Sequence, residues 1–384
     1  MDLRPTDEQR LLRQTVREFA ESEMAPHTLE WDEAQQFPLA LLPKLAGLGL
    51  MGIQVPEHYG GAAMGAVEYC ICIEELARVD PSIALTVAAH NGLAAAHIYR
   101  FGSDAQRARY LTPLAEGRHL GGWALTEPQA GSDAGSTRTA ATPVAGGWRL
   151  NGTKTFTTHG TLAGTLVVMA VTDPAQGHHG ISAFVLERST PGLAAGRKEN
   201  KLGMRASDTA ELLLTDCVVP DDQRLGDLGE GFIGALSVLD AGRIGIAALA
   251  VELAQGAYEA ARRHAVVREQ FGQPTAGFQA NQFKLADMAT EIEAARWLTY
   301  RAAYLKDRGH PTTRESAIAK LFSSEAAVRV AEQGVQMHGG YGFVKDYPAE
   351  KFFRDVKLTT IGEGTSEIQR LVIAREYLDR PHDG

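Results

Sequence analysis

The sequence predicts a protein of class α+β, in which a helical segment, a β segment and a second helical segment follow one another. Two observations support this order. Apolar residues recur at helical spacing in the first and last thirds of the chain. The middle third is rich in Gly, Thr and Val, with short apolar runs between turn residues. For 384 residues two or three domains are expected, and we place them at 1–118, 119–226 and 227–384.

The first third carries signals for the start and the end of helices. Thr6 and Gln9 form a capping box that predicts a helix start, and Pro26 predicts the end of that helix. Two further helices are expected over 68–79 and 83–101, separated by an Asp-Pro-Ser turn. The N-terminal domain is therefore expected to be helical.

The middle third is expected to form an antiparallel or barrel-like β domain. Asn151-Gly152 is a dipeptide typical of tight hairpin turns, and the runs 148–150 and 153–157 on either side predict a hairpin. Turns that contain proline separate the later runs. Short buried strands are expected at 166–171, 181–186 and 211–214.

The last third returns to long helices. Apolar residues between Leu285 and Ile292 repeat at helical spacing, and a second helix is expected through 317–330. The segment 242–250 is rich in Gly and Ala, so we expect other helices to approach it closely.

Composition and charge exclude several classes of protein. Hydrophobic residues make up 44% of the chain and charged residues 22%, which is ordinary for a globular protein with its own core. The net charge of −9 argues against nucleic acid as a partner, because phosphate binding needs a basic face. A small anionic ligand needs only a local basic site and is still compatible with this charge.

The cysteines and histidines do not show the spacing of a metal site. Cys70, Cys72 and Cys217 include no CxxC pair, so we expect reduced core thiols and no metal. The N-terminus has no secretory signal, and the longest apolar stretch, near 244–251, is followed at once by Glu252. We therefore expect a cytoplasmic protein without a membrane partner.

Residues 47–52 fit the GxGxxG pattern of dinucleotide-binding folds, but their context argues against such a fold. The pattern has to follow a strand and open a helix. Here 39–48 is helix-like and 53–56 is expected to be extended, so the order is reversed. We interpret these glycines as the end of a helix.

Glu363 is the strongest candidate for a catalytic residue. It lies between Gly362 and Gly364, and glycines let the backbone take unusual dihedral angles and let a ligand come close. Ser366 and Gln369 form a predicted capping box, so a helix is expected directly afterwards. Burial against an apolar ligand would raise the pKa of Glu363 toward neutrality, where a general base is effective. From these residues alone, a loop carboxylate that only helps to cap the helix is an equally good interpretation.

Two glycine-containing loops are candidates for binding a cofactor. Residues 126–133 offer hydroxyl and backbone N–H groups that suit a phosphate or the edge of a flavin, although ordinary surface turns share this composition. Residues 336–342 follow a helix and either line a cofactor or form a plain interhelical turn.

Taken together, the motifs resemble the acyl-CoA dehydrogenase family over nearly the whole chain. The matching segments are 55–61, 126–133, 151–154, 201–205, 268–272, 278–279, 336–342 and 363–370. Segment 239–247 is similar to short-chain members of the butyryl-CoA dehydrogenase type. The resemblance implies an N-terminal α-helical domain, a middle antiparallel β domain and a C-terminal four-helix bundle.

The resemblance also implies a reaction, which is FAD-dependent α,β-dehydrogenation of a short-chain acyl-CoA to a trans-2-enoyl-CoA. Glu363 would take the α-proton while hydride passes from the β-carbon to flavin N5, with the thioester carbonyl polarised in an oxyanion-hole arrangement. Electrons would then pass to an electron-transfer flavoprotein. The family's FAD sites straddle subunits, so a homotetramer is expected.

The resemblance assigns binding residues one by one. Contacts with the isoalloxazine and ribityl region of FAD are expected from Trp123, Leu125, Thr126, Gly131, Ser132, Phe156, Thr157 and Thr158. Further cofactor-binding residues are expected at Arg268, Phe271, Gln279, Gln336, Met337, His338, Gly339, Gly340, Thr365, Ser366 and Glu367. Of these, Arg268, Gln279 and 336–340 would reach adenosine and pyrophosphate from a neighbouring subunit. The acyl-CoA is expected along Ser132, Asp240, Ala241, Gly242, Arg243 and Gly364.

Three residues depart from the family pattern. Gly362 stands where Tyr is common, Phe156 where Trp is common, and His338 where an aliphatic residue is usual. Some branched-chain members place the base at the position of Gly242, where glycine cannot serve, so a straight short-chain substrate is favoured. The alternatives are an acyl-CoA oxidase that uses oxygen directly, a non-catalytic flavoprotein relative that binds nucleic acid, and a scaffold protein that binds CoA without turnover.

Overall fold

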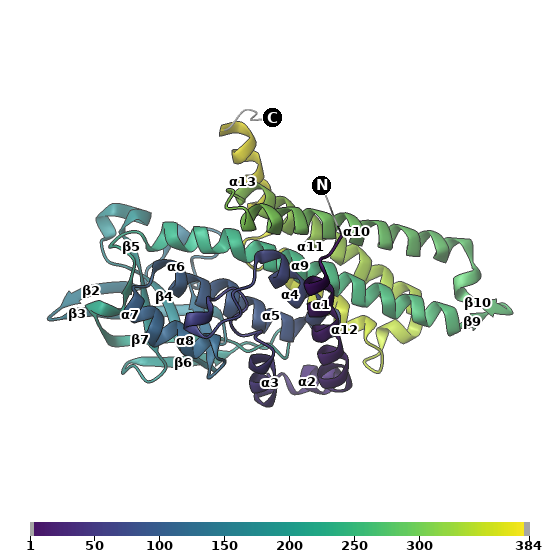
Figure 1. The fold of residues 1–384 in the computed structure, drawn as a ribbon, viewed down its shortest axis with the longest axis horizontal. Helices are drawn as coiled ribbons and strands as arrows, with labels where there is room; N and C mark the ends of the chain where they lie inside the picture. The colour runs from purple at the N-terminus through teal and green to yellow at the C-terminus, as the bar shows by residue number, and fades with distance from the viewer. Residues whose placement is uncertain (1–3, 380–384) are drawn as a thin grey trace.

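The computed structural model describes residues 4–379. The molecule is elongated, with the β sheet at one end and the long C-terminal helices extending to the other (Figure 1). A two-stranded hairpin, Glu269–Gln270 (β9) with Gln273–Pro274 (β10), lies at the far end of these helices. The sheet and this hairpin therefore mark opposite ends of the molecule.

The first third is helical, as predicted. Its α-helices are α1 (Asp7–Phe19), α2 (Thr28–Ala34), α3 (Leu42–Gly47), α4 (Ala66–Ala77), α5 (Pro81–Ala89), α6 (Ala96–Phe101), α7 (Asp104–Gln106) and α8 (Thr112–Ala115). Single π turns at Ala20–Met24, His90–Ala95 and Arg107–Leu111 continue three of them. The helices expected over 68–79 and 83–101 are confirmed, the second as α5, the π turn and α6.

The capping box at the start of α1 is confirmed. The Gln9 backbone N–H donates to Thr6 Oγ1 at 3.2 Å, and the Thr6 backbone N–H donates to Gln9 Oε1 at 3.0 Å. The prediction that Pro26 ends this helix is confirmed, because α1 and its π turn stop at Met24 and the 3-10 turn Ala25–His27 leads on to α2. Pro26 stands at the start of that 3-10 turn, where its missing N–H is not required.

The glycine-rich segment 47–52 follows the end of α3, as expected for a helix end, and Gly49 has φ 74°. Residues 53–56, which we expected to be extended, form turns instead. The Ile53 N–H donates to the buried Asn91 Oδ1 at 3.0 Å. The backbone N–H of Ile53 is therefore bound by the Asn91 side chain and not by a neighbouring strand.

The middle third forms one sheet of eight strands. They are β1 (Leu120–Ala124), β2 (Ala140–Val144), β3 (Gly147–Thr158), β4 (Ala163–Val171), β5 (Ile181–Glu187), β6 (Leu193–Lys198), β7 (Thr209–Pro220) and β8 (Arg224–Leu225). The order is β6-β7-β3-β2-β4-β5-β8, with β1 paired to β4. The pairs of β4 with β1 and with β2 are parallel and the other pairs are antiparallel, so the sheet is mainly antiparallel.

The predicted hairpin turn at Asn151-Gly152 is wrong. β3 runs without a break from Gly147 to Thr158, and its turn to β2 lies just before it, where Gly146 has φ 77°. At Gly152 the pairing of β3 with β7 shifts register instead of reversing direction. Because β3 pairs with β2 on one side and β7 on the other, the glycine makes a bulge and the local turn preference is overridden.

The last third forms long helices. They are α9 (Gly231–Val267), α10 (Gln279–Asp307), α11 (Thr313–His338), α12 (Ala349–Asp355) and α13 (Ser366–Asp379). α9 packs against α11 and α10 and also against α4 and α5 of the first third. One hydrophobic core contains residues from α4, α5, α9, α10 and α11, so the two helical parts of the chain share it.

α9 alone among the described helices is long and apolar enough to cross a membrane by length and composition. However, 67% of its most apolar 18-residue stretch is buried inside the protein. The core helix of a folded protein passes the same test, so this is weak evidence for a membrane span. The three cysteines, as expected, are buried and unpaired with one another.

Candidate active site

Glu363 lies in the short loop that leads into α13, and its backbone is left-handed, with φ 54°, followed by Gly364 with φ 93°. The predicted capping box of Ser366 and Gln369 is wrong by one residue. Thr365 Oγ1 accepts the Ile368 N–H at 3.3 Å, so Thr365 caps the helix. The Ser366 hydroxyl is buried and has no hydrogen-bond partner within residues 4–379.

Two buried side chains hold the backbone around Glu363. Gln369 Nε2 donates to the carbonyl oxygens of Glu363 at 3.2 Å and of Gly364 at 3.0 Å. Lys320 Nζ, from α11, donates to the Gly364 carbonyl at 2.6 Å. A left-handed backbone is costly for a residue other than glycine, so these bonds stabilise a conformation that the loop would not keep alone.

The Glu363 carboxylate lies against Gly242 of α9. A Cβ atom added to Gly242 would overlap Glu363 Oε2 and lie 3.2 Å from Leu93 Cδ2. Oε2 is buried, and no described residue forms a hydrogen bond with it. The fold therefore brings together two residues predicted for the site, Gly242 and Glu363, that are far apart in the sequence.

Burial raises the pKa of Glu363 to about 7, and the positive charges of Lys320 and Arg243 oppose this rise. Arg243 is itself buried and donates to Asp240 Oδ1 at 2.6 Å. Thr313 Oγ1 donates to the other carboxylate oxygen of Asp240 at 2.7 Å. A carboxyl group that titrates near neutrality can accept a proton and release it again at physiological pH.

The β sheet supplies the next predicted residues. Trp123, on β1, donates its indole N–H to His97 Nδ1 at 3.2 Å, an interaction that the sequence did not indicate. Phe156 is 64% exposed and has φ 52°, although it belongs to a strand. The neighbouring Thr157 hydroxyl is buried, with no hydrogen-bond partner among residues 4–379. A Cβ atom on Gly131 would meet no atom within 4 Å, so open space adjoins that loop.

Hydrogen bonds of Glu127 and Lys154 anchor the loop 126–133. The buried Glu127 carboxylate accepts the Arg138 N–H at 2.8 Å, the Thr139 N–H at 3.0 Å and Lys154 Nζ at 2.7 Å. Lys154 Nζ also donates to the Leu125 carbonyl at 3.1 Å. These bonds fix the start of the loop to β3.

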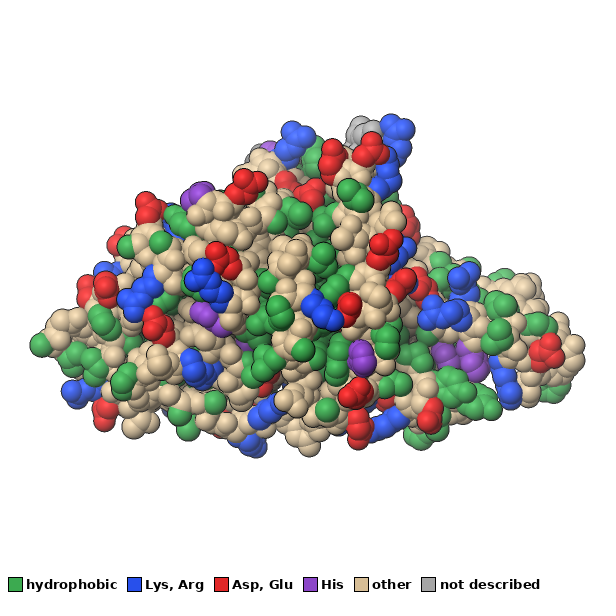
Figure 2. Space-filling model, turned by 60° about the horizontal axis from the view of Figure 1, so that its bottom comes forward, with side chains coloured by type: hydrophobic (Ala, Val, Ile, Leu, Met, Phe, Trp, Pro, Cys, Tyr) green, Lys and Arg blue, Asp and Glu red, His purple; other side chains and the backbone are tan. Residues whose placement is uncertain are grey.

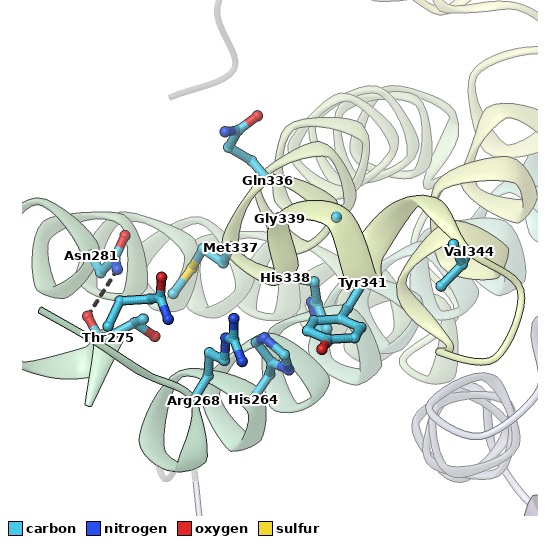
Figure 3. Close-up of a pocket in the computed structure, with 12 residues that line it drawn as sticks. His264, Arg268, Thr275, Asn281, Gln336, Met337, His338, Gly339, Tyr341 and Val344 are labelled. Carbon is cyan, nitrogen blue, oxygen red and sulfur yellow. Dashed lines mark hydrogen bonds between the residues drawn. The ribbon is translucent and has the colours of Figure 1, made fainter. Parts of the chain in front are cut away.

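A separate pocket of about 530 Å³ lies at the other end of the bundle (Figure 3). It is lined by His264, Arg268, Gln270, Thr275, Asn281, Gln336, Met337, His338, Gly339, Gly340, Tyr341 and Val344. The His264 and His338 rings stack with centroids 4.5 Å apart, and the Arg268 guanidinium lies 5.3 Å from the centroid of Tyr341.

Arg268 and 336–340, which we predicted as one set, do meet in this pocket, whereas Phe271 and Gln279 are not among its lining residues. His264 and Asn281 also line this pocket and were not predicted. A histidine on the last turn of a long helix carried no motif that could have identified it. Histidine and hydrophobic side chains gather on the surface toward this end of the molecule (Figure 2).

Three family models match the chain in order. They are the acyl-CoA dehydrogenase N-terminal domain over residues 6–118, the middle domain over 122–217 and the C-terminal domain over 229–378. The short-chain specific acyl-CoA dehydrogenase of Clostridium acetobutylicum is 45% identical over 374 residues, which are 97% of this chain and 99% of the relative.

Two solved structures are similar over their full length. Butyryl-CoA dehydrogenase from Megasphaera elsdenii has a TM-score of 0.97 at 42% identity, over 98% of this chain and 100% of that chain. A chain from a study of the electron transferring flavoprotein of Acidaminococcus fermentans has a TM-score of 0.98 at 46% identity, over 99% and 100%. Sequence, fold and the three domain matches agree, and this protein belongs to the acyl-CoA dehydrogenase family of oxidoreductases.

Proposed function

We propose that this protein dehydrogenates a short-chain acyl-CoA to a trans-2-enoyl-CoA, with Glu363 as the base that removes the α-proton. The observation that carries the proposal is the Glu363 carboxylate, whose buried Oε2 lies against Gly242 and has no hydrogen-bond partner within residues 4–379. Burial raises the pKa of this group to about 7. A base is most effective when its pKa lies near the working pH, and this group meets that condition.

FAD is the cofactor of the family, and this chain has a surface that fits it. Phe156 presents an exposed ring, the Thr157 hydroxyl lacks a partner within the described chain, and Gly131 faces open space. Gly339 and Gly340 likewise face open space in the distant pocket. When bound, FAD supplies the hydride acceptor.

The two sets of FAD-binding residues lie at opposite ends of one protomer (Figure 1). One set is on the sheet, and the other lines the pocket beside β9 and β10. We propose that the pocket completes the FAD site of a neighbouring subunit in a homotetramer. The exposed side chains of Phe271 (94%) and Phe343 (88%) near that pocket support a contact between subunits, because large apolar groups are costly in water.

The substrate is proposed to lie along Ser132, Asp240, Ala241, Gly242, Arg243 and Gly364. The buried Arg243 forms an ion pair with the partly exposed Asp240 on the face of α9 beside Glu363, so their charges are already balanced before substrate arrives. The names of the Clostridium and Megasphaera relatives support a short chain. The Acidaminococcus neighbour supports an electron-transferring flavoprotein as the acceptor of electrons.

Anaerobic titration of the purified flavoprotein with butyryl-, hexanoyl-, octanoyl- and isovaleryl-CoA tests the proposal. Butyryl-CoA should bleach the flavin absorbance most completely. Glu363→Gln should keep FAD bound and lose the bleaching. The matched control is Glu325→Gln, which removes a carboxylate that pairs with Arg370 at 2.8 Å. This control should bleach normally. Bleaching by Glu363→Gln at the wild-type rate would exclude Glu363 as the base. Rapid reoxidation by air would favour an oxidase.

A further inference from the structure

Lys320 is a buried charged side chain with no part in the reaction described so far. It lies on α11, its relative exposure is 0%, and its ammonium donates to the Gly364 carbonyl at 2.6 Å. It forms no ion pair within 4.0 Å in the part of the chain that the structure describes. Burying an ammonium group costs free energy that one hydrogen bond to a carbonyl does not recover. Its presence beside Glu363 therefore calls for a functional reason.

We propose that Lys320 is a positioning residue for Glu363, which holds the backbone of the base through the Gly364 carbonyl and favours the ionised carboxylate by its charge. This inference rests on the proposed function of Glu363. It adds a residue that neither the family motifs nor the glycine pattern of the sequence pointed to.

The mechanical part follows from the hydrogen bonds at the loop. Glu363 and Gly364 are both left-handed, and the Gly364 carbonyl accepts from Lys320 and from Gln369. The Glu363 carbonyl accepts only from Gln369, at the longer distance of 3.2 Å. Removal of Lys320 would leave one amide to hold the strained Glu363 and the glycine after it, so the carboxylate should become less ordered.

The electrostatic part follows from the charges that face Glu363. The charged groups are Lys320 from α11 and Arg243 with its partner Asp240 from α9. Tyr69 from α4 also faces Glu363, and burial raises its pKa, so it is uncharged. Glu325 and Glu367 also act on Lys320. Lys320 opposes the effect of burial on Glu363 more strongly than Arg243 does. Removing its charge therefore raises the pKa of Glu363 further.

The charge of Lys320 is present in the pH range in which Glu363 titrates. Burial lowers the pKa of Lys320 to about 8, although the Glu363 carboxylate opposes this. Glu363 is ionised above about pH 7, and Lys320 is charged below about pH 8. The rate of flavin reduction should therefore rise through about pH 7, where Lys320 still carries its charge.

Two variants separate the two parts. Lys320→Gln keeps a donor for the Gly364 carbonyl and loses the charge, whereas Lys320→Met loses both. In Lys320→Gln the acidic limb of flavin reduction by butyryl-CoA should move up by about one pH unit, which is a rate about tenfold lower on that limb. Lys320→Met should show the same shift and a lower plateau. The control Lys345→Gln, at an exposed lysine, should match the wild type.

A measurement that needs no turnover distinguishes failure of this inference from failure of the proposed function. The infrared carboxyl band of Glu363, identified by its loss in Glu363→Gln, should titrate at higher pH in Lys320→Gln than in the wild type, whether or not any acyl-CoA is a substrate. An unchanged midpoint in both Lys320 variants would overturn the inference. A change in rate that only follows lost FAD or a lower melting temperature would also overturn it.

Discussion

Replacing Gly242 by Ala tests the contact that defines the site. The added Cβ would overlap Glu363 Oε2 and lie 3.1 Å from the Glu363 Cδ atom and 3.2 Å from Leu93 Cδ2. Optimal separations between carbon atoms are about 3.5–4.0 Å, so Leu93 has to yield by a few tenths of an ångström and the carboxylate by about 1 Å. A misplacement of about 1 Å costs on the order of 100-fold in rate, which is about 2.7 kcal/mol of activation free energy.

The same substitution should change folding stability much less. Overpacking a core costs about 1–3 kcal/mol, and replacing Gly by Ala inside a helix returns up to about 1 kcal/mol. The expected result is a flavoprotein with normal FAD content, a melting temperature within a few degrees of the wild type, and flavin reduction by butyryl-CoA about 100-fold slower. Stopped-flow bleaching under anaerobic conditions measures the rate.

Gly334→Ala is the matched control, because Gly334 lies inside α11 and its added Cβ would make ordinary contacts at 3.5 Å and 3.7 Å with Ala257. It should gain up to about 1 kcal/mol of stability and reduce flavin at the wild-type rate. If Gly242→Ala also reduced flavin at the wild-type rate, the carboxylate would not lie against α9 in the reacting enzyme, and the placement of the base described above would be refuted.

Two further predictions concern buried charges. Burial and the nearby Glu74 carboxylate raise the pKa of Glu252 from 4.5 to about 7, so the stability tied to its protonated form is present below about pH 4.5 and is lost as the pH rises through about 7. Urea unfolding should show the wild type losing stability relative to Glu252→Gln between pH 5 and pH 8, and parallel curves would contradict this. Lys154→Met leaves the buried Glu127 carboxylate without its cation, at a cost of about 3–5 kcal/mol. The melting temperature and the ratio of FAD to protein should both fall, and an unchanged ratio would show that this ion pair does not support the flavin loop.

The local patterns of the sequence predicted the type of most elements. Apolar periodicity predicted α10 and α11, and the run of short apolar segments predicted β4 and β5, because each pattern reflects which side chains face the core. The predictions failed where a distant partner decided the outcome. Gly152 looks like a hairpin turn but lies in the middle of β3, since the chain on both sides of it pairs with β7.

The sequence alone determined the order of helical, β and helical segments and placed Glu363 between two glycines ahead of a helix. Only the tertiary structure decided what surrounds that residue. Gly242 of α9 lies against the carboxylate, and Lys320 of α11 and Gln369 of α13 bind the loop backbone beside it. No spacing in the sequence encodes that meeting. The pKa of Glu363 depends on this enclosure, because burial and opposing charges are properties of the packed interior rather than of any local pattern.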